Sequence, residues 1–135
     1  MVINSSALVA VLLGKPAAAA MAAAIAAGSP RLLSAANLLE TSIVIENRKG
    51  AVGGRELDLQ LYRSGIEVVA FDPEQAEIAR VAWRRFGKGR HPAGLNYGDC
   101  FAYALAKQRR LPLLFRGSDF AQTDIEAVQV DRTVS

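Results

Sequence analysis

The fold class is decided by residues 66–75, which read IEVVAFDPEQ. The first six of these residues form a run rich in β-branched side chains, which is typical of a strand. Helix-start signals follow at once, with Asp72 at the N-cap, Pro73 at the first helical position and Gln75 at the capping-box position. A strand that leads directly into a helix is the unit from which parallel α/β sheets are built.

The same alternation extends over the rest of the chain. Further strands are predicted at residues 2–3, 31–33, 113–115 and 128–130, and helices at residues 7–13, 17–27, 35–48, 55–63, 73–86 and 98–110. Because the strands are short and apolar on both faces, they predict a parallel sheet that helices cover on both sides. The chain is 135 residues long, which is too short for two ordinary domains, so we expect residues 1–135 to form one domain.

Composition excludes several classes of protein. Hydrophobic residues make up 51% of the chain and charged residues 21%, which indicates a globular protein and excludes a disordered one. Cys100 is the only cysteine, so no disulfide forms within the chain and a cytoplasmic location is expected. His91 is the only histidine, which excludes zinc sites of the His/Cys type. The net charge of +3 permits an anionic partner such as nucleic acid but does not establish one.

Residues 7–27 imitate a signal peptide, because they are apolar and rich in alanine. A signal peptide carries positive charge ahead of its apolar run, whereas residues 1–6 contain no basic side chain and Lys15 interrupts the middle. Each apolar piece is also too short to span a bilayer. We therefore predict two successive helices and no membrane segment, with Pro16 in the first turn of the second helix.

Four polar residues fall where a parallel sheet places its functional site, outside the carboxyl ends of the strands. They follow a strand or begin a neighbouring helix, and they are Asn4, Glu40, Asp99 and Asp119. Glycine-rich phosphate loops are missing from the sequence, which argues against dinucleotide enzymes and P-loop NTPases. Asn4 has no acidic neighbour, which argues against a phosphate-receiver domain. Oxygen ligands of this kind suit Mg²⁺ or Mn²⁺, although acids at strand ends also serve as plain caps and turn formers.

Four segments match, in order, the motifs of a known family. They are residues 2–8 (VINSSAL), residues 34–40 (SAANLLE), residues 95–104 (LNYGDCFAYA), and residues 113–124, which contain GSDF followed by Thr123 and Asp124. In this order they resemble the opening strand and the three later acidic motifs of PIN-domain ribonucleases. Within that family they resemble the VapC-type toxins of bacterial toxin–antitoxin pairs. The resemblance covers the chain from residue 2 to about residue 130.

The resemblance implies a fold, an activity and partners. The implied fold is a three-layer α/β/α domain with a short parallel sheet of four to five strands. The implied activity is cleavage of RNA phosphodiester bonds with Mg²⁺ or Mn²⁺. The implied metal-binding and catalytic residues are Asn4, Glu40, Asp99 and Asp119. The implied partners, besides the RNA substrate, are a second copy of the chain in a homodimer and a cognate antitoxin that binds over the active-site groove.

One residue departs from the family pattern, which carries aspartate where this chain has Asn4. Asparagine keeps the shape and one carbonyl oxygen of aspartate but loses its negative charge, so metal affinity is expected to fall. We therefore predict an inactive or weak nuclease, whether the asparagine was engineered or is natural. The alternative function is a PIN-like module that binds antitoxin or RNA without cleavage.

Other residues have both a functional and a structural interpretation. Secondary site candidates, for a metal-bound water, a phosphate group or an outer position around the metal, are Ser6, Arg116, Ser118 and Asp124. The basic segment 80–91 is either a path for RNA or acidic antitoxin residues or a solvated helix face. Trp83, Phe86 and Tyr97 are either core residues or surfaces on which bases stack.

Overall fold

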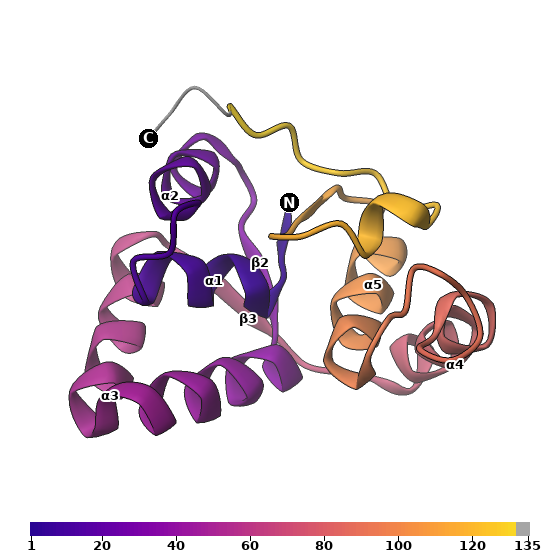
Figure 1. The fold of residues 1–135 in the computed structure, drawn as a ribbon, viewed down its shortest axis with the longest axis horizontal. Coiled ribbons are helices and arrows are strands. Elements are labelled where there is room, and N and C mark those ends of the chain that lie inside the picture. The colour runs from indigo at the N-terminus through magenta and orange to yellow at the C-terminus, as the bar shows by residue number, and fades with distance from the viewer. Residues whose placement is uncertain (132–135) are drawn as a thin grey trace.

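A computed structural model describes residues 1–131, and the last four residues of the predicted domain lie outside this range. The chain forms one parallel sheet of four strands, which are β1 (Val2–Ile3), β2 (Leu32–Ser34), β3 (Glu67–Val69) and β4 (Leu113–Leu114). The helices are α1 (Ser5–Leu12), α2 (Ala18–Ala27), α3 (Ala35–Arg63), α4 (Pro73–Phe86), α5 (Tyr97–Arg109) and the short 3-10 helix η1 (Phe120–Gln122) (Figure 1).

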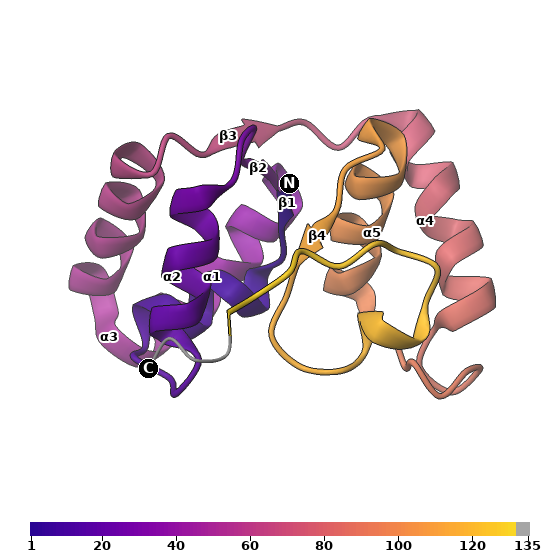
Figure 2. The ribbon, with the colours of Figure 1, turned by 90° about the horizontal axis from the view of Figure 1, so that it is seen from above.

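Alternate residues of the strands enter two separate cores, one on each face of the sheet. On one face, side chains of α4 and α5 pack against Val2, Leu32 and Leu113. On the other face, side chains of α1 and α2 pack against Ile3, Leu33 and Leu114. Figure 2 shows the strands between these two groups of helices. The predicted α/β fold with a three-layer α/β/α architecture and four parallel strands is therefore confirmed.

The strand order is β3-β2-β1-β4, so the chain builds outward from β1 in one direction and then returns to pair β4 on the other side of β1. The order of the strands thus reverses between β1 and β4. In open parallel sheets this reversal opens a crevice at the carboxyl ends of the two strands. Asn4 follows β1 directly, and the segment that carries Asp119 follows β4, so the topology directs both residues to this crevice.

The predicted helix break at Gly50 is present, but it is a kink rather than a gap. Gly50 has φ 66° and ψ −156°, and helical structure resumes directly after it, so α3 continues to Arg63. Positive φ is a conformation that glycine adopts without steric cost. The prediction of two helices was therefore right about the position of the break. It was wrong about residues 51–54, which are helical.

The predicted strand at residues 128–130 was wrong. A single isolated bridge joins Ala127 to Leu113, and the segment then runs without regular structure toward the start of α2 (Figures 1 and 2). The contact with β4 ends at Leu113, whose backbone N–H donates to the carbonyl of Glu126 at 2.9 Å. The backbone N–H of Val128 still donates to the carbonyl of Leu113 at 3.0 Å.

Two helix-start predictions also need correction. Pro16 precedes Ala17, the N-cap of α2, and so lies outside the first turn. The Asp72 carboxylate caps α4 by accepting from the backbone N–H of Gln75 at 2.8 Å, as predicted. The Gln75 side chain does not complete a capping box, because it donates to the carbonyl of Ala70 and to the side chain of Gln108. Among residues 1–131, no helix has the length and apolar character that a membrane span requires.

Arg31 fastens the ends of two helices beside the sheet. Its Nε and Nη2 atoms donate to the carbonyls of Ile25 and Ala26 in the last turn of α2, at 2.6 and 2.8 Å. Its Nη1 atom donates to the carbonyl of Ser64 at the end of α3, at 2.7 Å. Carbonyls at helix ends lack partners within the helix and carry partial negative charge, so the guanidinium satisfies three of them at once.

We expect Arg31→Met to lower the free energy of unfolding by about 2 kcal/mol, because three carbonyls lose a charged donor. Arg31→Lys should recover less than half of that loss, since an ammonium group cannot reproduce the planar fork. Urea denaturation measures both variants, with Arg48→Met as the control at an exposed arginine on α3. Full recovery with lysine would show that charge alone, and not the fork, matters.

Candidate functional site

Asn4 lies at the carboxyl ends of β1 and β4, and the polar residues gathered there, Asn4, Glu40, Asp99 and Asp119, are together called the crevice. Its backbone N–H donates to the carbonyl of Leu114 at 2.9 Å, which fixes the residue between β1 and β4. Its side-chain Nδ2 donates to the hydroxyl of Ser6 at 2.8 Å, and the same hydroxyl accepts from the backbone N–H of Arg116 at 2.9 Å. Ser6 therefore ties the segment after β1 to the segment after β4 and holds the amide of Asn4 in one orientation.

The remaining side-chain oxygen of Asn4 has no hydrogen-bond partner. Asn4 is only 4% exposed, and its Oδ1 atom is buried. A buried carbonyl oxygen without a partner costs about 1–3 kcal/mol, so such atoms are rare in folded proteins and call for an explanation. An oxygen left free in this way is available to a ligand that donates a proton or carries positive charge.

Asp99 enters the same crevice from the first turn of α5. Its backbone N–H donates to Oδ1 of Asn96 at 2.8 Å, and its Oδ2 accepts from the backbone N–H of Asn96 at 3.1 Å. This reciprocal pair is a complete capping box. Asp99 is therefore the third residue of the helix, and Asn96 occupies the N-cap.

The pKa of Asp99 is raised from its ordinary value of 3.8 to about 6. Burial is the main cause, since the carboxyl group is taken out of water, and the charges of Asp119 and Glu40 raise the pKa further. Hydrogen bonds from the backbone of Asn96 and the side chain of Asn4 act in the opposite direction but do not prevail. The crevice thus holds negative charge that the protein itself does not neutralise.

Glu40 reaches the crevice from α3 and is held on one side only. Its Oε1 accepts from the hydroxyl of Ser5 at 2.6 Å and from Nδ2 of Asn37 at 3.1 Å. The Asn37 amide also donates to the carbonyl of Gly98 at 2.9 Å, which links α3 to α5. These contacts fix the carboxylate, and within residues 1–131 no hydrogen bond is found for its Oε2.

The sequence leaves Ser5 open between a helix cap and a site residue. The structure makes Asn4 the N-cap of α1, and the Ser5 hydroxyl donates to Glu40. Asn37 is fully buried and was not singled out. One signal was available, because Asn37 stands three residues before Glu40 and therefore on the same face of the predicted helix.

Gly98 explains how α3 and α5 come this close. A Cβ atom at Gly98 would overlap the carboxylate of Glu40, well inside contact distance. The absence of a side chain is therefore what lets Glu40 approach the first turn of α5. In the sequence, glycine at this position marked a motif, and the structure supplies its physical reason.

Asp119 and its neighbours form the exposed rim of the crevice. Asp119 precedes η1 and is exposed, yet its charge still raises the pKa of Asp99. Arg116 and Ser118 are exposed on the same segment and line a cleft of about 610 Å³ that extends toward Met21 of α2. The predicted residues Asn4, Ser6, Glu40, Asp99 and Asp119 are thus linked by hydrogen bonds or charge, with Arg116 and Ser118 beside them.

Asp124, predicted as an outer metal ligand, has different contacts. Its Oδ1 accepts from the hydroxyl of Tyr103 at 2.6 Å. Its Oδ2 pairs with Lys107 at 2.8 Å and with Arg85 at 3.5 Å. Both oxygens are therefore engaged in joining the segment after η1 to α4 and α5. These contacts describe a residue that holds the fold together.

The side chains of the crevice offer the oxygen ligands that a hard divalent cation prefers. They do not lie close enough together to form a complete metal site. All of its side-chain donors are oxygens, and both the unpartnered Asn4 Oδ1 and the raised pKa of Asp99 fit a missing positive charge. Within the described residues, however, no three His, Cys, Asp or Glu side chains lie close enough together to hold a metal. Asparagine at position 4 removes the carboxylate that would sit at the centre.

The fold and crevice define a class of proteins that comparison with known families identifies. The family model for the PIN domain matches residues 1–126, so the chain belongs to the PIN domain family. Within it, the chain is of the VapC type. It is 57% identical to a ribonuclease VapC of Mycolicibacterium smegmatis, over 95% of this chain and 99% of that one. It is 56% identical to ribonuclease VapC30 of Mycobacterium tuberculosis, over 95% and 98%.

Solved structures show the same fold at low sequence identity. VapC20 of Mycobacterium tuberculosis, described as a toxin that cleaves the sarcin–ricin loop, matches with a TM-score of 0.79 at 14% identity, over 96% of this chain and 98% of that one. VapBC2 from Rickettsia felis, bound to a promoter DNA fragment, matches with a TM-score of 0.73 at 15% identity, over 96% and 98%. The resemblance to VapC-type PIN domains that the sequence motifs indicated is confirmed.

Gly98→Ala should lower the free energy of unfolding by about 1–3 kcal/mol, because the added Cβ displaces the Glu40 carboxylate. In a Glu40→Ala background the same substitution should cost far less. Gly54→Ala is the control, since a Cβ there meets only the flexible end of Glu46. Chemical denaturation of the unchanged protein, the two single variants and the double variant measures these costs. An equal cost in both backgrounds would contradict the role assigned to Gly98.

The raised pKa of Asp99 predicts a pH dependence in metal-free buffer. Because the folded pKa of about 6 exceeds the ordinary 3.8, the contribution of Asp99 to stability is complete below about pH 4 and is lost as the pH rises through 6. Asp99→Asn should therefore gain about 1–2 kcal/mol relative to the unchanged protein between pH 4 and pH 7. Urea denaturation across this range tests it, with the exposed Asp58→Asn as control. Parallel stability curves for Asp99→Asn and the unchanged protein would refute it.

Proposed function

We propose that this chain is an endoribonuclease toxin that cleaves RNA phosphodiester bonds with a Mg²⁺ or Mn²⁺ ion held by oxygen ligands. The observation that carries the proposal is the uncompensated negative charge around Asp99, next to the unpartnered Oδ1 of Asn4. The relatives that match over 95% of the chain are named ribonucleases, which supports the reaction class. We propose Asn4, Glu40, Asp99 and Asp119 as the residues that would hold the ion.

The ion, when bound, would supply positive charge to the phosphodiester and lower the pKa of a water molecule. The protein positions its own groups for the same reaction. Ser5 and Asn37 fix Oε1 of Glu40, which leaves Oε2 as the oxygen that would face the ion. We propose that the side chain of the exposed Arg116, whose backbone N–H donates to Ser6 beside the crevice, pairs with a phosphate oxygen.

We propose that Asn4 weakens this activity. The Asn4 side chain hydrogen-bonds Asp99, but it brings no negative charge to the ion. Its neutral oxygen is a poorer ligand for a hard cation than a carboxylate. The proposed ion would therefore bind less tightly, and the water that it activates would be held less firmly.

The alternative function is a PIN-like module that binds antitoxin or RNA without cleavage, and Asn4 is the feature that favours it. Both functions share the same partners. We propose a cognate antitoxin, because proteins of this fold include a toxin–antitoxin complex from Klebsiella pneumoniae. We further propose a homodimer and a cytoplasmic location, the latter because the single Cys100 is free and buried.

Asn4→Asp should raise the rate of single-stranded RNA cleavage in Mn²⁺ at least tenfold, because the ion regains a charged ligand. Asn47→Asp, at an exposed position on α3, adds the same charge elsewhere and should change nothing. Adding Asp99→Asn to the Asn4→Asp variant should abolish the gain. Calorimetric titration with Mn²⁺ gives a readout besides activity and should show tighter binding by Asn4→Asp.

The outcomes separate the two functions. An Asn4→Asp protein that binds Mn²⁺ more tightly and cleaves RNA supports the nuclease. If it binds RNA but cleaves no faster than the original chain, the non-cleaving module is favoured and the attenuating role of Asn4 is rejected.

A further inference from the structure

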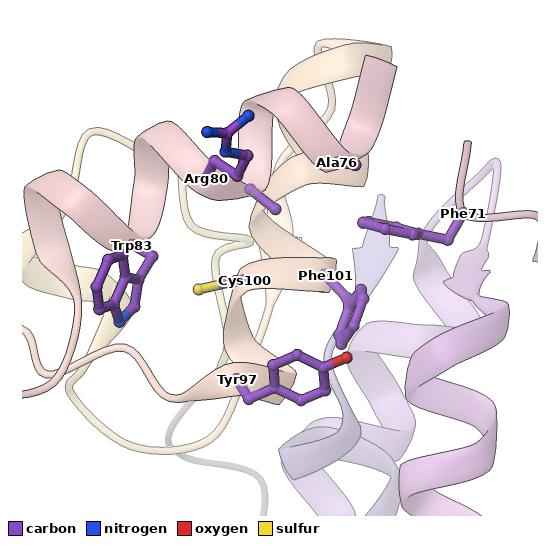
Figure 3. A pocket seen from close by; sticks show the side chains of 8 residues that line it. Phe71, Ala76, Arg80, Trp83, Tyr97, Cys100 and Phe101 are labelled. Carbon is purple, nitrogen blue, oxygen red and sulfur yellow. The ribbon is translucent and has the colours of Figure 1, made fainter. Parts of the chain in front are cut away.

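An apolar groove of about 370 Å³ lies between α4 and α5, on the side of α5 that the candidate site does not use. Figure 3 shows Trp83 on one side of it, Phe71 and Phe101 on the other, and the Cys100 thiol between them. Nothing in the proposed reaction requires these aromatic side chains. The groove therefore needs its own explanation, because exposed apolar surface of this kind generally marks a binding site.

Three of the aromatic rings that line the groove pack edge to face, and two of the lining rings are exposed. Phe101 lies 4.6 Å from Phe71 at 79° and 4.8 Å from Tyr97 at 85°, measured between ring centroids and planes. Tyr97 is 82% exposed and Trp83 is 45% exposed. A planar ring that enters the groove thus meets the exposed rings of Tyr97 and Trp83, with the partly buried rings of Phe101 and Phe71 beside them.

Positively charged side chains cover one face of Trp83 and surround the groove. The guanidinium of Arg90 lies 4.1 Å from the Trp83 ring, and Arg80 lines the groove itself. Arg84 and Lys88 are exposed on the same helix end and loop. Among the described residues that line the groove there is no acidic side chain, and Glu77 only pairs with Arg80 on the surface. The charge thus complements a polyanion that carries flat rings.

The groove adjoins the candidate site through the first turn of α5. Tyr97 and Asp99 are separated only by Gly98, so one helical turn presents an aromatic ring to the groove and a carboxylate to the crevice. A nucleotide chain with one phosphate at Asp99 would therefore have a neighbouring base within reach of Tyr97. Paired bases are stacked inside a duplex and cannot enter, whereas an unpaired base can.

We propose that this groove is a base-binding subsite for single-stranded RNA, in which an unpaired base stacks on Phe101, Tyr97 and Trp83 while Arg80 contacts the adjoining phosphate. Stacking on aromatic side chains tolerates every base, so the subsite selects unpaired nucleotides more than sequence. The inference rests on the proposed function, since it places the substrate of the same site. It deepens that function by assigning unpaired nucleotides as the substrate of the site.

Trp83 is the only tryptophan of the chain, so its fluorescence reports on the groove directly. We would titrate the full chain, in EDTA to prevent cleavage, with a single-stranded RNA hexanucleotide and with an abasic chain of the same length. The expected result is saturable quenching by the RNA and at least tenfold weaker binding of the abasic chain. Equal binding of the two probes would overturn the proposal, because it would leave only the charge of the backbone.

Substitutions test which aromatic side chains bind the base. Tyr97→Leu and Phe101→Leu should weaken RNA binding at least fivefold, and Tyr97→Phe should keep it, because the ring remains. Tyr62→Leu is the matched control, since Tyr62 is 86% exposed on α3 and lies outside the groove. Circular dichroism checks that the variants are folded, and Tyr97, as an exposed side chain, is the substitution least disturbing to the fold.

A different occupant would give a different result. If Tyr97→Leu leaves RNA binding unchanged but shifts the protein from dimer to monomer in analytical ultracentrifugation, the groove is a protein interface and the proposal is wrong. Because the titration is done without metal, its failure would leave the Asn4→Asp cleavage test untouched. Conversely, base stacking without any cleavage would support the subsite and refute the nuclease.

Discussion

Glu40 and Asp99 come from helices that are distant in sequence, and they act on one another only because α5 presents bare backbone to α3 at Gly98. This close approach is the constraint on which the rest of the candidate site depends. The Asn37 amide locks it by donating to Glu40 and to the carbonyl of Gly98. The sheet supplies the third side, since Asn4 is fixed between β1 and β4 where the strand order reverses. Three layers of the fold thus meet at one polar point.

Much of this architecture follows from local patterns in the sequence. Apolar pairs at residues 2–3, 32–33 and 113–114 alternate their faces in a strand, and each pair contributes one residue to each core. Strong start and stop signals placed α4 and α5 within a residue of their observed ends. The predicted strand at residues 128–130 failed because the segment leaves the sheet after a single bridge to Leu113, and whether a segment stays beside an edge strand depends on tertiary contacts that local pattern does not reveal.

The sequence predicted the acidic and amide residues of the candidate site, but not every residue that orients them. Asn4, Glu40, Asp99 and Asp119 stand out because carboxylates and amides at strand ends are visible in a sequence. Asn37 does not, because its role is to orient Glu40 and to bond the backbone of Gly98, a contact 61 residues away along the chain. Asp124 also stands within a motif, but its carboxylate pairs with Lys107 and accepts from Tyr103. Which acids are engaged and which are free depends on tertiary contacts.

The charge of the crevice links two effects of Asn4, one on the stability of the metal-free fold and one on metal affinity. Burial and the neighbouring charges of Asp119 and Glu40 already raise the pKa of Asp99 to about 6. An aspartate at position 4 would add another negative charge to the same crevice, so without a cation the pKa of Asp99 would rise further. A four-carboxylate crevice would therefore depend strongly on its ion, whereas the asparagine makes the metal-free fold easier to keep. The substitution relieves the folded protein of charge repulsion and, by the same physics, takes from the ion the ligand that it would bind most strongly.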